Sequence, residues 1–118
     1  MYKRNEGFRY TFPEPLEGKL FLSTVKDSEK PSNKTNILIR NMSPRGCSFS
    51  SGLSFPADEE LLVYIEFTIN AEPLSAVGQI AGKKEMGSQI FYGLTFLSTD
   101  EDSEALTKEI KKFVFQNR

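Results

Sequence analysis

Apolar and polar residues alternate along several stretches of the chain, most clearly from Leu61 to Asn70. The odd positions there are apolar, and the later even positions are polar. Because successive side chains of a strand point to opposite faces, this alternation predicts a half-buried β-strand. A turn-rich break at 70–73 and a second alternating stretch at 74–81 predict that a hairpin is formed.

The same alternation recurs in three other stretches, at residues 16–23, 46–50 and 89–97, and the apolar run 37–39 predicts a further short strand that ends at Met42. Polar and turn-forming residues at 27–34 and 83–87 are expected to break the chain between strands. About six short strands separated by turns favour an antiparallel β-barrel or a β-sandwich.

The period changes near the carboxy terminus. Four apolar residues recur there at helical spacing, namely Leu106, Ile110, Phe113 and Val114. This spacing predicts an amphipathic helix over about 100–116. Thr99 is the expected N-cap, and the acidic residues at 100–102 complement the positive end of the helix dipole.

Composition narrows the function classes. The chain has 118 residues, which fits one domain, and it carries 15 basic and 16 acidic residues. Histidine is absent, so the commonest general base and metal ligand is missing. We therefore expect no enzyme and no cofactor. The single cysteine, Cys47, is expected to be a small core residue. No signal peptide or membrane-spanning stretch is recognisable, which favours a cytoplasmic protein without membrane insertion.

The charges are unevenly placed along the chain. Lys3, Arg4 and Arg9 crowd the beginning, so we expect residues 1–12 to form a flexible basic arm before a domain at 13–118. The balanced net charge of −1 argues against nucleic-acid binding. A small barrel that stacks bases on strand aromatics is the weakest alternative, with three candidate residues, Tyr64, Phe91 and Tyr92.

One turn stands out for its chemistry. Asn41-x-Ser43-x-x-Gly46 joins two of the short predicted strands. Asn and Ser side chains commonly close turns, Pro44 fixes one dihedral angle, and Gly46 is expected to take a positive φ. By itself, the motif indicates a turn between strands.

The spacing of this turn resembles the Asn/Asp-x-Ser-x-x-Gly signature of PilZ domains, which are bacterial receptors for cyclic di-GMP. The basic segment 3–9 precedes the first strand, where that family carries its arginine motif. The stretch 92–96, Tyr-Gly-Leu-Thr-Phe, is similar to the Gly-x-x-Phe of the family's last strand. The resemblance covers nearly the whole chain. It implies a mainly β fold, a six-stranded antiparallel split β-barrel with Greek-key connections and a C-terminal α-helix.

The resemblance also implies a ligand site, formed by Arg4, Arg9, Asn41, Ser43 and Gly46. Arginine suits cyclic di-GMP because its planar fork pairs bidentately with phosphate or with guanine O6 and N7. Short hydrogen-bonding groups at Asn41 and Ser43 would lie beside the ligand, and Gly46 would let backbone approach closely.

The chain departs from the family at one position of its arginine motif, Arg-x-x-x-Arg. Arg9 matches the second arginine, but Asn5 stands where the first belongs, and Arg4 lies one residue further away. Two readings follow: a receptor whose arm and protein contacts change when the ligand binds, or a degenerate PilZ domain that binds a protein without nucleotide. The partner is unidentified, and a homodimer through the region of Phe115 is an open alternative. The family implies roles in motility, biofilm formation or virulence.

Overall fold

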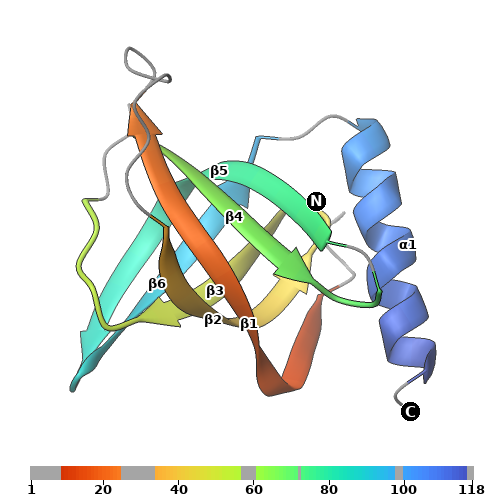
Figure 1. Cartoon of the computed structure of the whole chain (residues 1–118), viewed down its shortest axis with the longest axis horizontal. Helices are drawn as coiled ribbons and strands as arrows, with labels where there is room; N and C mark the ends of the chain where they lie inside the picture. The colour runs from red at the N-terminus through yellow and green to blue at the C-terminus, as the bar shows by residue number, and fades with distance from the viewer. Residues whose placement is uncertain (1–8, 25–33, 57–60, 72, 98–99, 117–118) are drawn as a thin grey trace, which may run out of the picture.

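The chain folds into a mainly β structure with one helix at its end, which confirms the predicted fold class (Figure 1). The computed structural model describes residues 9–24, 34–56, 61–71, 73–97 and 100–116. Its elements are β1 (Tyr10–Thr24), β2 (Thr35–Ser43), β3 (Gly46–Ser51), β4 (Leu61–Thr68), β5 (Pro73–Met86), β6 (Gln89–Phe96) and α1 (Asp100–Gln116). No helix in these ranges is long and apolar enough to cross a membrane.

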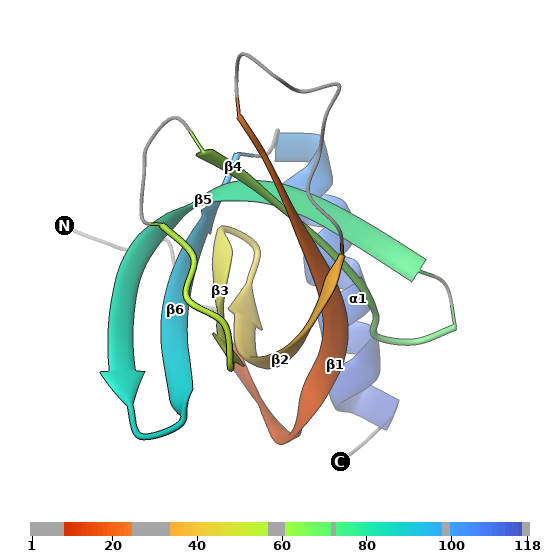
Figure 2. The ribbon, with the colours of Figure 1, turned by 60° about the vertical axis from the view of Figure 1, so that its left-hand side comes forward.

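The six strands close into one antiparallel barrel in the order β1-β2-β3-β6-β5-β4, with β4 pairing back onto β1. The spatial order β4-β1-β2-β3 is a Greek key, as expected. Figure 2 shows the strands wrapped around a common interior, with α1 outside them. Each strand pairs with two neighbours over at least part of its described length, which limits the open sheet edge available for aggregation.

Helix α1 packs against the end of the barrel where β2 and β4 finish (Figure 1). Ile110 is fully buried there, and Phe113 makes edge-to-face contacts with Tyr10 and Phe12 at 5.9 and 5.6 Å between ring centroids. Such aromatic pairs add about 0.5–1.5 kcal/mol beyond the area they bury. Tyr10 and Phe12 therefore close this end of the barrel beneath the helix.

The opposite end is crossed by the segment after β3, residues 52–56, which we call the strap (Figure 1). Phe55 of the strap is 7% exposed and packs on Tyr92, with 5.4 Å between ring centroids. The Tyr92 hydroxyl donates to the Leu53 carbonyl and accepts from the Phe55 N–H, both at 2.8 Å. One side chain of β6 thus holds the strap in place by two hydrogen bonds.

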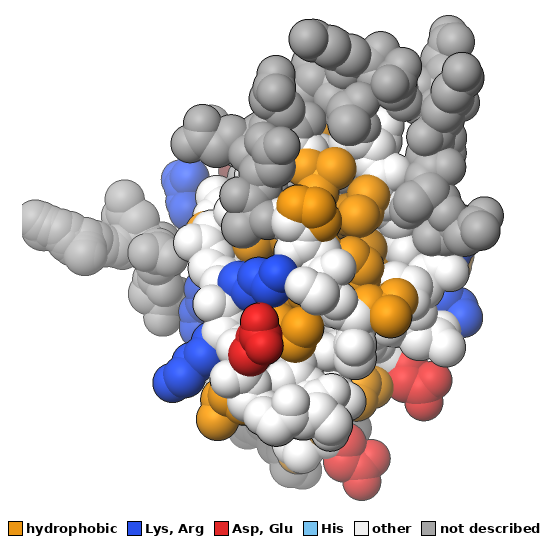
Figure 3. Space-filling model, turned by 90° about the vertical axis from the view of Figure 1, so that its left-hand side faces the viewer, with side chains coloured by type: hydrophobic (Ala, Val, Ile, Leu, Met, Phe, Trp, Pro, Cys, Tyr) orange, Lys and Arg blue, Asp and Glu red, His pale blue; other side chains and the backbone are white. Residues whose placement is uncertain are grey.

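Lys83 of β5 adds a second attachment for the strap. Its Nζ donates to Ser54 Oγ at 2.7 Å and to the Phe55 carbonyl at 3.0 Å. This end of the molecule faces the viewer in Figure 3, where apolar side chains are exposed beside Lys and Arg. Leu53 of the strap is 53% exposed.

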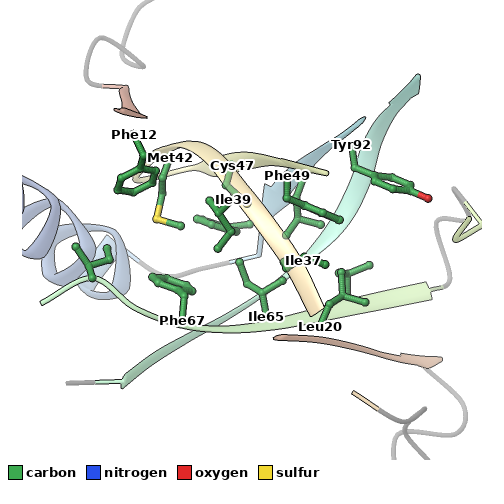
Figure 4. Packing of buried hydrophobic residues seen from close by; sticks show 14 of the residues in the cluster. Phe12, Leu20, Ile37, Ile39, Met42, Cys47, Phe49, Ile65, Phe67 and Tyr92 are labelled. Atoms are coloured by element: carbon green, nitrogen blue, oxygen red, sulfur yellow. The ribbon is translucent and has the colours of Figure 1, made fainter. Parts of the chain in front are cut away.

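The core fills the barrel between these two ends (Figure 4). Alternating residues of the strands point inward, as predicted for 61–70, where Val63, Ile65 and Phe67 are buried. Cys47 and Phe49 on β3 lie on the same inward side, also as predicted. Full burial of such side chains contributes roughly 1.5–3 kcal/mol each. The hydrophobic pattern therefore placed the core correctly.

Two strands run further than the pattern predicted. The expected break at 83–87 is wrong, because β5 continues to Met86 and the hairpin turn lies at Gly87, whose φ is 67°. Residues 81–86 are exposed, so no alternation marks them. Strand β1 begins at Tyr10, so residues 10–12 of the expected arm lie in the barrel. Thr99 and nearly all of 27–34 lie outside the described residues.

Candidate functional site

The turn motif connects β2 to β3, and its serine shapes the turn. Ser43 pairs with Gly46 across the hairpin and is 1% exposed. Its Oγ accepts from the Arg45 N–H at 3.2 Å and donates to the Gly46 carbonyl at 3.5 Å. The Pro44 carbonyl in turn accepts from Ser103 Oγ at 3.4 Å, which ties the turn to α1. Ser43 therefore fixes the backbone of the motif.

Gly46 is required by close packing of strands. A Cβ at this position would lie 2.3 Å from the carbonyl oxygen of Leu94 on β6. The expectation of a positive φ at Gly46 is wrong, because among the described glycines only Gly87 has one. The glycine instead lets β3 approach β6 at the base of the turn.

Arg9 and Asn41 meet beside this turn. Tyr10 pairs with Met42 in the β1–β2 ladder, which brings the preceding Arg9 alongside β2. The Nη1 group of Arg9 donates a hydrogen bond to Asn41 Oδ1. The structure thus joins two predicted site residues that lie 32 positions apart. Arg4, the other predicted arginine, lies outside the described residues.

A β-bulge in β2 places a second arginine next to Asn41. Ile39 pairs with Phe49 and Asn41 with Ser48, so Arg40 is an extra residue between two ladder pairs. Its Nε and Nη2 donate to Ser50 Oγ at 3.2 and 3.0 Å. Its guanidinium also lies over the Phe91 ring, 5.3 Å from the centroid. The sequence indicated only that Arg40 is a charge beside the turn.

A shallow hollow of about 490 Å³ lies on the outer face of the barrel beside Asn41. It is lined by Arg40, Asn41, Ser48, Gly82, Lys83, Lys84, Phe91, Tyr92 and Gly93. Three of these described residues are cationic and none is acidic. The Lys83 ammonium donates to the strap, so Arg40 and Lys84 supply the positive charge that favours an anionic ligand. Its volume falls in the range of small-molecule sites.

A larger hollow, about 1010 Å³, follows the bent half of β1 and contains none of the predicted site residues. The bend lies at 12–15, where two prolines interrupt the register with β2. Its ionisable lining residues are Glu14, Glu17, Lys19 and Glu66. Three carboxylates against one ammonium disfavour a phosphodiester. The smaller, positive hollow is therefore the better candidate for an anion.

Two other groups have structural roles. Burial raises the pKa of the Cys47 thiol to about 12, with the nearby Arg9 charge partly opposing that rise, so the thiol is protonated at neutral pH. Tyr92, considered above for base stacking, is 2% exposed and packs on Phe49. Tyr64 stacks on Phe21 outside the barrel, at 4.9 Å. Tyr92 is therefore too buried to stack on a base, whereas Tyr64 and Phe91 are half-buried and the oligonucleotide-binding alternative stays a prediction.

The sequence matches the model of one protein family, and the structure is similar to a solved structure. The family model described as "PilZ domain" matches residues 6–116. A solved structure, "Crystal structure of PilZ domain of CeSA from cellulose synthesizing bacterium", is similar with a TM-score of 0.53 and 13% sequence identity. The similarity covers 95% of this chain and 100% of that chain, and at such low identity it indicates the fold alone. No curated protein matches the sequence.

Proposed function

The chain belongs to the PilZ domain family, and from that premise we propose that it is a receptor for cyclic di-GMP. This is a family of ligand-binding receptor domains rather than of enzymes. The observation that carries the proposal is the contact of Arg9 with Asn41, which places the last residue of the basic segment 3–9 beside the turn motif. An arginine held at this turn supplies the planar fork that phosphate or guanine requires.

The predicted residues divide into two roles. Arg9 is exposed and Asn41 is half-buried, so both offer polar groups to a ligand on the barrel surface. Ser43 and Gly46 are buried and contribute by fixing the backbone that carries Asn41. Arg4 completes the proposed site as a second cation from the arm.

Ligand binding is proposed to change the arm. Arg9 already donates to Asn41, so a ligand that binds either side chain must replace or share this hydrogen bond. A ligand shifts a conformational equilibrium only by the difference in its affinity for the two states. Exchange of the Arg9–Asn41 contact for ligand contacts provides this difference in affinity. The arm then takes a new position, which changes the surface offered to a protein partner.

Titration calorimetry with cyclic di-GMP tests the proposal. We expect the wild type to bind and Arg9→Ala to bind roughly tenfold to a hundredfold more weakly, because a charge-assisted hydrogen bond contributes ~1.5–3 kcal/mol. Lys112→Ala, which removes an exposed charge on α1, is the matched control and should bind like the wild type. Absence of binding heat in the wild type would overturn the proposal.

The degenerate alternative rests on Asn5, which replaces the first arginine of the family motif. It predicts that cyclic di-GMP leaves the melting temperature of the wild type unchanged. The receptor proposal predicts instead that saturating ligand raises the melting temperature, since a ligand that binds only the folded state stabilises it. If Arg4 replaces the missing arginine, then Arg4→Ala should reduce that rise.

A further inference from the structure

A row of small and polar residues crosses the outer face of the barrel. The strand pairings place Asn41 beside Ser48, Ser48 beside Gly93, and Gly93 beside Gly82. The row therefore runs across β2, β3, β6 and β5, perpendicular to the strands, and extends the turn-motif region by roughly 14 Å at the usual strand spacing. Its last two positions have no side chain beyond hydrogen.

The paired glycines leave open space above the sheet. A Cβ on Gly82 would meet nothing within 4 Å, and one on Gly93 would meet only the Gly82 nitrogen, at 3.9 Å. Neither glycine has a positive φ, so backbone conformation does not require them. Glycine within a strand costs stability, and it commonly marks a place where another group approaches the backbone closely.

A second bulge lies at the far end of this row. Ile80 pairs with Leu94 and Gly82 with Gly93, so Ala81 is an extra residue in β5. It matches the bulge that makes Arg40 an extra residue in β2. Bulges locally increase twist and redirect side chains, and they are frequent beside binding sites. The two bulges therefore lie at either end of the section formed by Ser48, Gly93 and Gly82.

Arg40, Phe91 and Lys84 form one wall of this section. Ser50, Phe91 and Lys84 are neighbours in the adjacent row of the sheet. The Arg40 guanidinium is held at one edge by Ser50 and on one face by Phe91. A guanidinium that is already oriented loses less conformational freedom when it binds a planar group. Lys84 is exposed and adds positive charge to the same wall.

We propose that this section, which we call the glycine trough (Ser48, Gly82 and Gly93, with Arg40, Phe91 and Lys84 as its wall), binds a purine base of the ligand. The base lies flat over the two glycines, and its edge accepts hydrogen bonds from Arg40 as guanine O6 and N7 do from arginine. Lys84 offsets the charge of the attached phosphate. This inference rests on the proposed function and extends its site from the turn motif towards β5.

Calorimetric titration of two glycine variants tests the trough. A Cβ on Gly82 meets nothing within 4 Å, so Gly82→Leu should place its side chain over the floor, and we expect exclusion of the base to weaken cyclic di-GMP binding by roughly tenfold or more. Gly52→Leu is the matched control, because a Cβ there also meets nothing within 4 Å and Gly52 lies outside the trough. It should keep wild-type affinity.

Arg40→Ala is expected to weaken binding by roughly tenfold or more as well. Wild-type affinity in Gly82→Leu or in Arg40→Ala overturns the glycine trough while leaving the receptor proposal intact. Absence of binding in the wild type overturns the receptor proposal, and the trough with it. Melting curves of each variant, compared with the wild type, separate loss of ligand contacts from loss of fold.

Discussion

At Gly46 the backbone of β3 passes so close to β6 that a Cβ would lie 2.3 Å from the carbonyl oxygen of Leu94. No flexible side chain can move to relieve that contact, since the atom belongs to the backbone. We expect Gly46→Ala to lower the free energy of unfolding by about 1–3 kcal/mol, the usual cost of overpacking. Thermal melting checks this result, with Gly52→Ala as a control that should melt like the wild type.

Cys47 gives the folded state a dependence on alkaline pH. Its thiol has a pKa of about 12 in the folded protein because it is buried, whereas an exposed thiol ionises near ~8.5. The stabilisation from the protonated thiol is therefore complete below about pH 8.5 and is lost as pH rises towards 12. We expect the wild type to lose stability over this window more steeply than Cys47→Ala, as measured by denaturant unfolding. Parallel pH profiles of the two proteins would contradict this assignment.

Single residues were predictable where a local motif carries them. The spacing of Asn41, Ser43 and Gly46 in the sequence was sufficient to locate the turn. The contacts of the Arg40 guanidinium with Ser50 and Phe91 were not predictable. Both partners lie on neighbouring strands, and neither forms a sequence motif with Arg40. Such contacts depend on strand register, and a register shift of one residue at the bulge changes which face Arg40 occupies.

At the scale of elements, a strand could be predicted from the sequence only where one of its faces is buried. Strands with one buried face, such as β4, showed clear alternation. The outer half of β5 did not, because its residues are exposed and pair only within the β5–β6 hairpin. The sequence also did not predict the bulges at Arg40 and Ala81. A single inserted residue interrupts an alternating pattern too briefly to be recognised.

The Tyr92 hydroxyl of β6 makes two of the hydrogen bonds that hold the strap. Replacing Tyr92 with Phe removes the group that pairs with the Leu53 carbonyl and the Phe55 N–H. We expect this change to cost about 1–3 kcal/mol of stability and to speed hydrogen exchange of the Phe55 amide. Tyr64→Phe, on the outer surface, serves as the control. Unchanged exchange at Phe55 in Tyr92→Phe would show that Lys83 and packing hold the strap without the hydroxyl.

At the scale of the whole molecule, the net charge conceals an asymmetry. The chain carries a net charge of −1, yet the hollow beside Asn41 is lined by three cations. The larger hollow along β1 carries the opposite excess. A small anionic ligand is therefore directed to one face of the barrel, although the balanced total makes broad binding to polyanions unfavourable. The order of the basic segment, the turn motif and the Gly-x-x-Phe stretch along the sequence indicated the family. The distribution of charge between the two hollows, in contrast, could be recognised only from the folded structure.

The most direct test of the receptor proposal is a two-dimensional amide NMR titration of the chain with cyclic di-GMP. At 13.4 kDa the protein suits this method, and the spectra report both binding and location. We predict saturable shifts at Arg9 and Asn41, extending through Ser48 to Gly82 and Gly93, with little change in 14–19. An absence of shifts, or shifts confined to the hollow along β1, would contradict the proposal.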